Sequence, residues 1–269
     1  MEREFGGRAF NLGETHFSLW EGEEVKGTLA VITKDVDWSG EVFVSNIYVR
    51  ERAEFKLLLE NAMNYCSNLK PKGIKLGIYP SQSYLIPTIE EYGFTKVYKA
   101  VVLKHRESKR SIEKCVSGDI KLTNFSNAYK REFQGIVNRA FVNSPNAGRM
   151  TSEELNELIE KCKQNPGLAG ICLYNGNPAG VYELSIVSNV GWIKAIAVDP
   201  IYQGIGIGKI LLEKSVRTLY ASGCKEVKLV VISTNEKAVN LYSKYGFEED
   251  TVRSIWFMRP CTTYNLSVG

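Results

Sequence analysis

The hydrophobic pattern of the second half of the chain predicts two helices near its start. Pro166 and Gly167 should end the second of them. Thr151 lies three positions before Glu154, which is the spacing of a capping box, so this helix should begin there. Its apolar stripe comprises Leu155, Leu158, Ile159 and Cys162. The first helix is predicted over residues 127–141, with apolar side chains at helical spacing: Phe133, Ile136, Val137, Ala140 and Phe141.

Apolar runs rich in β-branched residues alternate with the helices and predict strands. These runs cover residues 120–123, 169–174, 179–187, 192–198 and 226–232, with a last pair of strands within 247–258. Asn175, Gly176, Asn177 and Pro178 should form a hairpin turn. Two further helices are expected over residues 206–221 and 236–244. This order, β-α-α-β-β-β-α-β-α-β, predicts an α+β fold, a curved mixed α/β sheet with helices on both faces.

The two halves of the chain share a sequence repeat. Lys56 recurs as Lys209, an offset of 153 positions (209 − 56), and the Tyr-Gly-Phe triplet at 92–94 recurs at the same offset at 245–247. Upstream, Ile47 best matches Ile196, an offset of 149 positions (196 − 47), so four residues are missing from the first copy. Repeats of this kind indicate a duplicated structural unit.

The repeat divides the chain into two expected domains, residues 1–112 and 113–269. In the first, strands at 28–33 and 41–49 should form a hairpin, and the residues before it leave no room for the two early helices. The charged stretch from Lys104 to Ser117 is interpreted as the linker, or else as an extension of the last strand of the first domain.

Composition narrows the functional classes. With 269 residues, 44% hydrophobic and 24% charged, the chain has an ordinary globular composition. A net charge of +4 gives no electrostatic argument for a nucleic-acid partner. Six scattered cysteines and two histidines lack the spacing of a metal site, so reduced thiols and no metal are expected. No apolar run is long enough for a membrane span, so we expect a cytoplasmic protein that is a monomer or homodimer.

A glycine-rich loop stands between a predicted strand and a predicted helix. It comprises Gln203, Gly204, Ile205, Gly206, Ile207, Gly208 and Lys209. The free amides at a helix start, next to glycines, can bind phosphate. Lys209 is followed by Ile210 instead of Ser or Thr, which excludes a Walker A loop, and Lys209 also occupies the third-glycine position of a dinucleotide fingerprint.

At these residues the sequence resembles the GCN5-related N-acetyltransferase (GNAT) family, whose loop is Gln/Arg-x-x-Gly-x-Gly/Ala. Gln203, Gly206 and Gly208 match that loop. Residues 196–200 resemble the family's fourth strand, and a downstream motif is matched by Asn235, Ala238, Leu241, Tyr242, Gly246 and Phe247. The resemblance covers about 190–248 strongly. It implies tandem GNAT-like domains and acetyl-CoA as co-substrate.

The resemblance also implies how coenzyme A would bind. Its pyrophosphate would lie on the amides of residues 204–209 and its pantetheine arm along Ile196, Ala197 and Val198. Asn235 would contact the cofactor, although its position just before a helix also suits a simple cap.

Proton transfer is assigned to two further residues. By resemblance, Tyr242 is the general acid that protonates the leaving thiolate, the alternative being a packing role. Relatives often carry a carboxylate where this chain has Lys194 and Ala195. Glu183 on the preceding strand is the candidate base, while a solvent-facing side chain and a base role for water remain open.

The first copy lacks the residues associated with this chemistry. At the repeat offset, Tyr242 corresponds to Ile89 and Asn235 to Gln82, and residues 50–53 replace the glycine loop. We therefore expect a degenerate first domain and a catalytic second domain that acetylates a primary amine of a small molecule or peptide by direct attack. The alternative function is a regulatory module that binds acyl-CoA without catalysis.

Overall fold

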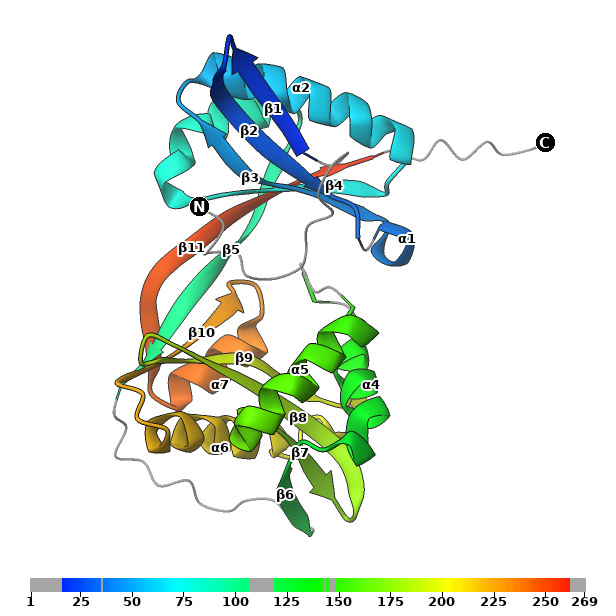
Figure 1. Cartoon of the computed structure of the whole chain (residues 1–269), viewed down its shortest axis with the longest axis vertical. Helices are drawn as coiled ribbons and strands as arrows, with labels where there is room; N and C mark the ends of the chain where they lie inside the picture. Colours follow the sequence, from blue (N-terminus) through cyan, green and yellow to red (C-terminus); the bar gives the residue numbers. More distant parts are fainter. Residues whose placement is uncertain (1–15, 35, 107–118, 143, 146–148, 262–269) are drawn as a thin grey trace, which may run out of the picture. The chain divides into compact units, whose positions relative to one another are not determined.

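The computed structural model describes residues 16–34, 36–106, 119–142, 144–145 and 149–261 (Figure 1). Contacts divide the chain into two compact units, residues 1–100 with 252–269 and residues 101–251. The expected boundary between residues 112 and 113 lies outside the described residues. The strand at Thr95–His105 (β5) and the strand at Phe247–Pro260 (β11) each contribute residues to both units.

The first unit is built on a mixed sheet with the strand order β1-β2-β3-β4-β11. Neighbouring strands are antiparallel except β3 and β4, which are parallel. Its strands are β1 (His16–Glu21), β2 (Glu24–Ile32), β3 (Glu41–Val49) and β4 (Gly73–Ile78). Its helices are α1 (Val36–Ser39), α2 (Arg52–Leu69), the 3-10 turn η1 (Pro80–Leu85) and α3 (Ile86–Glu91). The predicted hairpin of this half corresponds to β2 and β3.

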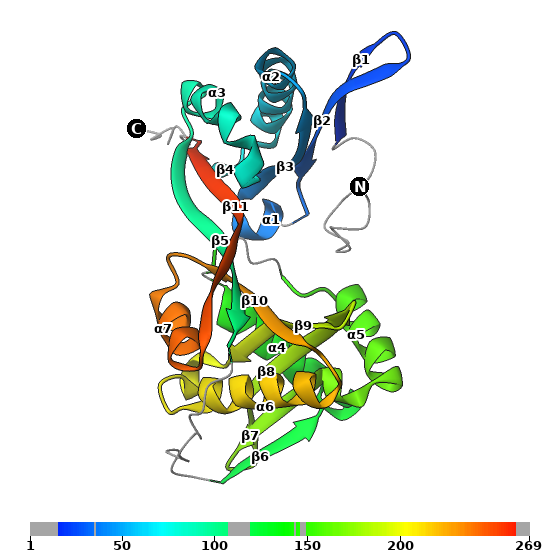
Figure 2. The same ribbon diagram turned by 90° about the vertical axis from the view of Figure 1, so that its left-hand side faces the viewer.

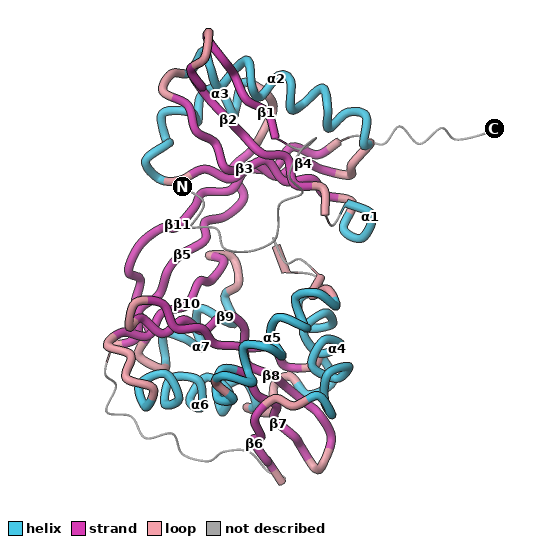
Figure 3. Tube along the Cα trace, in the orientation of Figure 1, coloured by secondary structure: helices cyan, strands magenta, loops and turns pink. Residues whose placement is uncertain are grey.

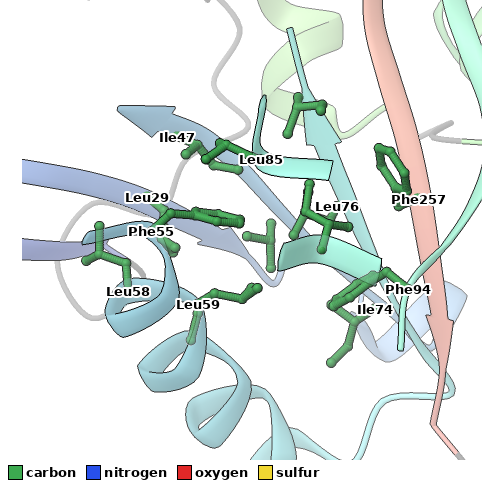
Figure 4. Packing of buried hydrophobic residues seen from close by; sticks show 14 of the residues in the cluster. Leu29, Ile47, Phe55, Leu58, Leu59, Ile74, Leu76, Leu85, Phe94 and Phe257 are labelled. Carbon is green, nitrogen blue, oxygen red and sulfur yellow. The ribbon is translucent and has the colours of Figure 1, made fainter. Parts of the chain in front are cut away.

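A single apolar cluster holds the first unit together (Figure 4). Phe55 and Leu59 on α2 are fully buried against Ile74 and Leu76 of β4. Phe257 of β11 belongs to the same cluster. Since burial of each such side chain contributes about 1.5–3 kcal/mol, the C-terminal part of β11 is an integral part of the first unit.

The second unit has the strand order β10-β9-β8-β7-β6, antiparallel except for β9 with β10. Its strands are β6 (Ile120–Asn124), β7 (Ala169–Tyr174), β8 (Asn177–Val187), β9 (Val190–Val198) and β10 (Glu226–Ile232). Its α-helices are α4 (Lys130–Phe141), α5 (Ser152–Gln164), α6 (Ile207–Ala221) and α7 (Glu236–Lys244). Short 3-10 turns are η2 (Asn127–Tyr129), η3 (Pro166–Leu168) and η4 (Pro200–Tyr202).

Helices cover both faces of this sheet, as expected (Figure 2). Leu155 and Leu158 of α5 pack with Phe133 of α4 on one face. Ile207 and Leu211 of α6 pack with residues of α7 on the other face. The predicted capping box of α5 is confirmed, because Thr151 and Glu154 exchange hydrogen bonds of 2.9 and 3.3 Å.

Gly180 on β8 allows the start of α6 to lie close to the sheet. A Cβ atom at this position would be 2.8 Å from Leu211 Cδ1 and 3.0 Å from the carbonyl oxygen of Ala197. A larger residue would crowd the side chains of Leu211 and Ile207 at the start of α6. The glycine loop that leads into α6 is therefore fixed against the end of β9.

Structural elements of the two units recur at the offsets found in the sequence (Figure 3). Strands β3 and β9 coincide at the offset of 149 (190 − 41), and β4 and β10 begin 153 positions apart (226 − 73). Within the repeated segment, the units differ before the long helix. Residues 199–206 separate β9 from α6, whereas Arg50 and Glu51 alone separate β3 from α2.

Two local predictions were wrong. Residues 247–260 form one long strand, β11, instead of a pair, because the strand continues from one unit into the other without a turn. The hairpin turn between β7 and β8 comprises Asn175 and Gly176 alone, since both adopt positive φ, 48° and 80°, and pairing resumes at Asn177.

The linker region is described only in part. β5 extends through Lys104 to His105, in agreement with the alternative interpretation for those two residues, and residues 107–118 lie outside the described part. Five cysteines are described as free thiols, four of them buried, and Cys115 is not described. Among the described residues, no helix is long and apolar enough to cross a membrane.

Candidate functional site

Strands β9 and β10 diverge at the predicted site. They pair in parallel only over Val190–Ile193 with Glu226–Leu229, although β9 continues to Val198. On its other side β9 stays paired with β8, where a register shift leaves Lys194 without a counterpart. The main chain of Ile196, Ala197 and Val198 is thus paired with β8 and not with β10. An extended ligand can hydrogen-bond to that open edge as an added strand does.

The glycine loop presents a series of open amides at the end of β9. Gly204 and Gly206 have φ values of 86° and 95°, which only glycine adopts without strain. Among the described residues, none accepts a hydrogen bond from the amides of residues 204–208. These amides lie at the N-terminus of α6, where the helix dipole favours an anion. Lys209 differs from the expectation, since its amide already donates to Gly206 O at 3.1 Å.

Other residues that the sequence predicted to bind the cofactor make contacts within the protein. The Gln203 side chain donates to Val198 O at 3.1 Å, and so ties the loop to the end of β9. The Lys209 ammonium lies 5.8 Å from the centre of the Tyr245 ring. Asn235 caps α7 by accepting from Ala238 N at 3.2 Å, as the simpler interpretation expected. Gly208 has space for a Cβ atom, with contacts at 3.6 and 3.8 Å.

Tyr242 lies on α7, half-buried among apolar residues of the α6 face. Its ring centre is 5.9 Å from that of Phe247. Burial raises the pKa of Tyr242 to about 12. The phenol therefore stays protonated at neutral pH and can act as a proton donor.

Glu183 lies on β8 opposite Ala195 and is half-buried, so it is not simply solvent-facing. Burial raises the pKa of its carboxyl group, Lys194 and Lys161 oppose this shift, and Glu154 adds to it. These neighbours place Glu183 on the α5 face of the sheet, whereas Tyr242 belongs to the α6 face. A raised pKa makes the carboxylate a stronger base, which suits a role in proton transfer.

Sequence reasoning missed an ion pair beside the loop. Arg139 on α4 donates to Asp199 Oδ2 from both Nε, at 3.0 Å, and Nη2. The Asp199 side chain is 7% exposed, and its Oδ1 accepts from Ile201 N at 3.3 Å. No spacing rule connects two residues 60 positions apart, so the sequence carried no signal for this contact.

In the first unit, the corresponding region is filled by the chain itself. Gln82 Nε2 donates to Ile47 O, and the Tyr84 hydroxyl donates to Val49 O at 3.0 Å. These carbonyl groups lie where β3 extends beyond its pairing with β4. At the start of α2, the Glu54 carboxylate accepts from the amides of residues 50 and 51 at 2.8 and 3.0 Å.

Comparisons with known proteins agree with this geometry. Residues 130–247 match the model of the "Acetyltransferase (GNAT) family". Mycothiol acetyltransferase of Clavibacter michiganensis is 27% identical over 141 residues, which cover 52% of this chain and 46% of that protein. The Escherichia coli "[Ribosomal protein bS18]-alanine N-acetyltransferase" is 35% identical over 83 residues, covering 31% of this chain and 56% of that protein. The chain thus spans only about half the length of these curated relatives.

Two solved structures share the fold over nearly the whole chain. A GCN5-related N-acetyltransferase from Sphaerobacter thermophilus has a TM-score of 0.72 at 19% identity, covering 97% of this chain and 84% of that one. A tandem GNAT protein from the clavulanic acid biosynthesis pathway has a TM-score of 0.60 at 12% identity, covering 93% and 83%. Residues 130–247, which contain the diverging strands and the open loop amides, are thus similar to the acetyltransferase (GNAT) family, and the two solved structures share the fold.

Proposed function

We propose that this protein is an N-acetyltransferase that transfers an acetyl group from acetyl-CoA to a primary amine of a small molecule or peptide. The observation that carries the proposal is the run of open amides at residues 204–208, shortly after a strand that has no β10 partner at Ile196–Val198, where Gln203 bonds the Val198 carbonyl alone. The amides suit a pyrophosphate, and the strand edge suits the amide groups of a pantetheine arm. Both lie on one continuous stretch of chain.

Acetyl-CoA, when bound, supplies the acetyl thioester. The loop and β9 hold it so that an amine can attack directly, and fixed orientation of two reactants can provide about 7–11 kcal/mol of the barrier in favourable cases. Tyr242 then donates its proton to the leaving sulfur, since its pKa, raised to about 12 by burial, keeps it protonated. Glu183 accepts the proton of the amine from the α5 face of the sheet.

Glu183 as a base predicts a specific pH dependence. The base must be deprotonated, so activity should fall as the pH falls through its raised pKa. Glu183→Gln should abolish this acidic limb and lower turnover, to be measured as kcat/KM between pH 5 and 9. Glu160→Gln, an exposed glutamate on α5, is the control and should keep the wild-type profile. An unchanged acidic limb in Glu183→Gln would assign the proton transfer to water.

The first unit is proposed to be a degenerate copy that binds no coenzyme A. Gln82 already bonds the carbonyl group of Ile47, which corresponds to that of Ile196. The Glu54 carboxylate occupies two amides at the start of α2 and would repel phosphate. This supports one cofactor site in each chain.

A second candidate function is acyl-CoA binding without catalysis. It is favoured by Lys194 and Ala195, which replace the carboxylate that relatives often carry on this strand. Such a module would need the glycine loop but neither Tyr242 nor Glu183.

Two measurements on the full chain test these functions. Calorimetric titration with coenzyme A and acetyl-CoA should give one site per chain. The amines to be tested are amino sugars, amino acids, polyamines and peptides with free N-termini. Thiol release from acetyl-CoA should occur when an amine of one of these classes is added, and not with the others. Binding without thiol release from any amine would favour the second function. No heat with coenzyme A or its esters would reject both functions.

A further inference from the structure

The Arg139–Asp199 ion pair joins helix α4 to the residue that follows β9, directly before the turn η4 that leads into the glycine loop. Asp199 uses every polar group it has. Its amide donates to Ala179 O at 2.9 Å, its carbonyl accepts from Tyr202 N at 2.8 Å, and its two carboxylate oxygens bond Ile201 N and Arg139. The Asp199 side chain therefore helps to fix the turn η4 that leads into the loop.

The ion pair also reduces the electrostatic repulsion between the Asp199 carboxylate and a phosphate group bound at the loop. A buried carboxylate before an anion-binding loop repels the phosphates that the loop receives, and the Asp199 side chain is 7% exposed, although its partner Arg139 is 56% exposed. Arg139 neutralises the carboxylate with two charge-assisted hydrogen bonds to one oxygen. Helix α4 thus affects the loop only through the contact between Arg139 and Asp199.

The Arg139 side chain passes over Gly135, one turn earlier in α4. A Cβ atom at Gly135 would lie 2.9 Å from Arg139 Nη1. Glycine in a helix interior costs about 1 kcal/mol relative to alanine. The side chain folds back over this glycine to reach Asp199.

We infer that Arg139 is a positioning residue for coenzyme A, which acts through Asp199 by neutralising that carboxylate and fixing the loop. This inference rests on the proposed function, because it requires that the loop bind a phosphate-bearing ligand. Removal of Arg139 should leave Asp199 as an uncompensated negative charge beside the loop amides.

The test compares coenzyme A affinity in four variants of the full chain. Arg139→Gln should weaken binding by about tenfold or more, and adding Asp199→Asn should restore it to within about threefold of wild type. Arg139→Lys keeps the charge but loses one of the two hydrogen bonds, and should bind more tightly than Arg139→Gln. Arg131→Gln removes an exposed charge from the same helix and should bind like wild type.

Kinetics supply a readout that a purely structural role would not give. In Arg139→Gln, KM for acetyl-CoA should rise while kcat stays within about twofold of wild type. Wild-type affinity in Arg139→Gln, or failure of Asp199→Asn to restore binding, would overturn the inference. If Arg139→Gln does not fold, the Arg139→Lys variant decides the question. Loss of measurable coenzyme A binding by folded Arg139→Lys would also overturn the inference. Absence of coenzyme A binding by the wild type would instead reject the proposed function.

Discussion

Turnover by the Tyr242→Phe variant should fall by a factor on the order of 10² or more, the usual contribution of a general acid. The phenol is protonated because burial raises its pKa to about 12, and phenylalanine keeps the ring while removing the only proton it could donate. Affinity for acetyl-CoA should stay near the wild-type value, since the loop and β9 are untouched. Steady-state thiol release and calorimetry measure the two quantities separately.

The neighbouring tyrosine gives a matched control. Tyr245→Phe removes a hydroxyl one turn later, where the ring lies beneath Lys209, and should leave turnover within about twofold. Equal turnover in Tyr242→Phe and wild type would remove the acid role and leave a packing role. Because the phenol ionises only far above neutrality, any alkaline limb below pH 10 should persist in the variant and belongs to another group.

A negative charge on the glycine loop should weaken coenzyme A binding strongly. Gly204 has φ of 86°, and a Cβ atom added there would have no heavy atom within 4 Å, so a side chain enters open space. Gly204→Asp and Gly204→Asn impose the same backbone strain and have nearly the same shape, and both residue types tolerate this conformation better than others. The aspartate variant should bind at least about tenfold more weakly than the asparagine variant.

The comparison isolates charge from strain. The difference between the two variants should shrink as salt rises, because an exposed charge is screened. Titrations at low and high ionic strength measure this trend. Equal affinities for the aspartate and asparagine variants would mean that the phosphates of coenzyme A do not lie at this loop, and the proposed function would lose its main support.

Local sequence patterns predicted most elements of the second unit. Strand β10 at 226–232 and helix α7 at 236–244 have the bounds expected from periodicity, and the capping box at Thr151 begins α5. Each of these elements depends on interactions among residues a few positions apart, and such interactions can be recognised in a single sequence. The repeat offsets likewise match the recurring elements of the two units.

Only the tertiary structure showed how these elements pair and which distant residues contact one another. The sequence by itself determined the strands, the helices, the glycine loop and the resemblance to the family. It could not reveal where β9 parts from β10, that β11 serves both units, or that Gln82 and Arg139 bond residues 35 and 60 positions away. Strand register and long-range contacts are set by packing among segments that are distant in the sequence. A local pattern of residues does not specify that packing.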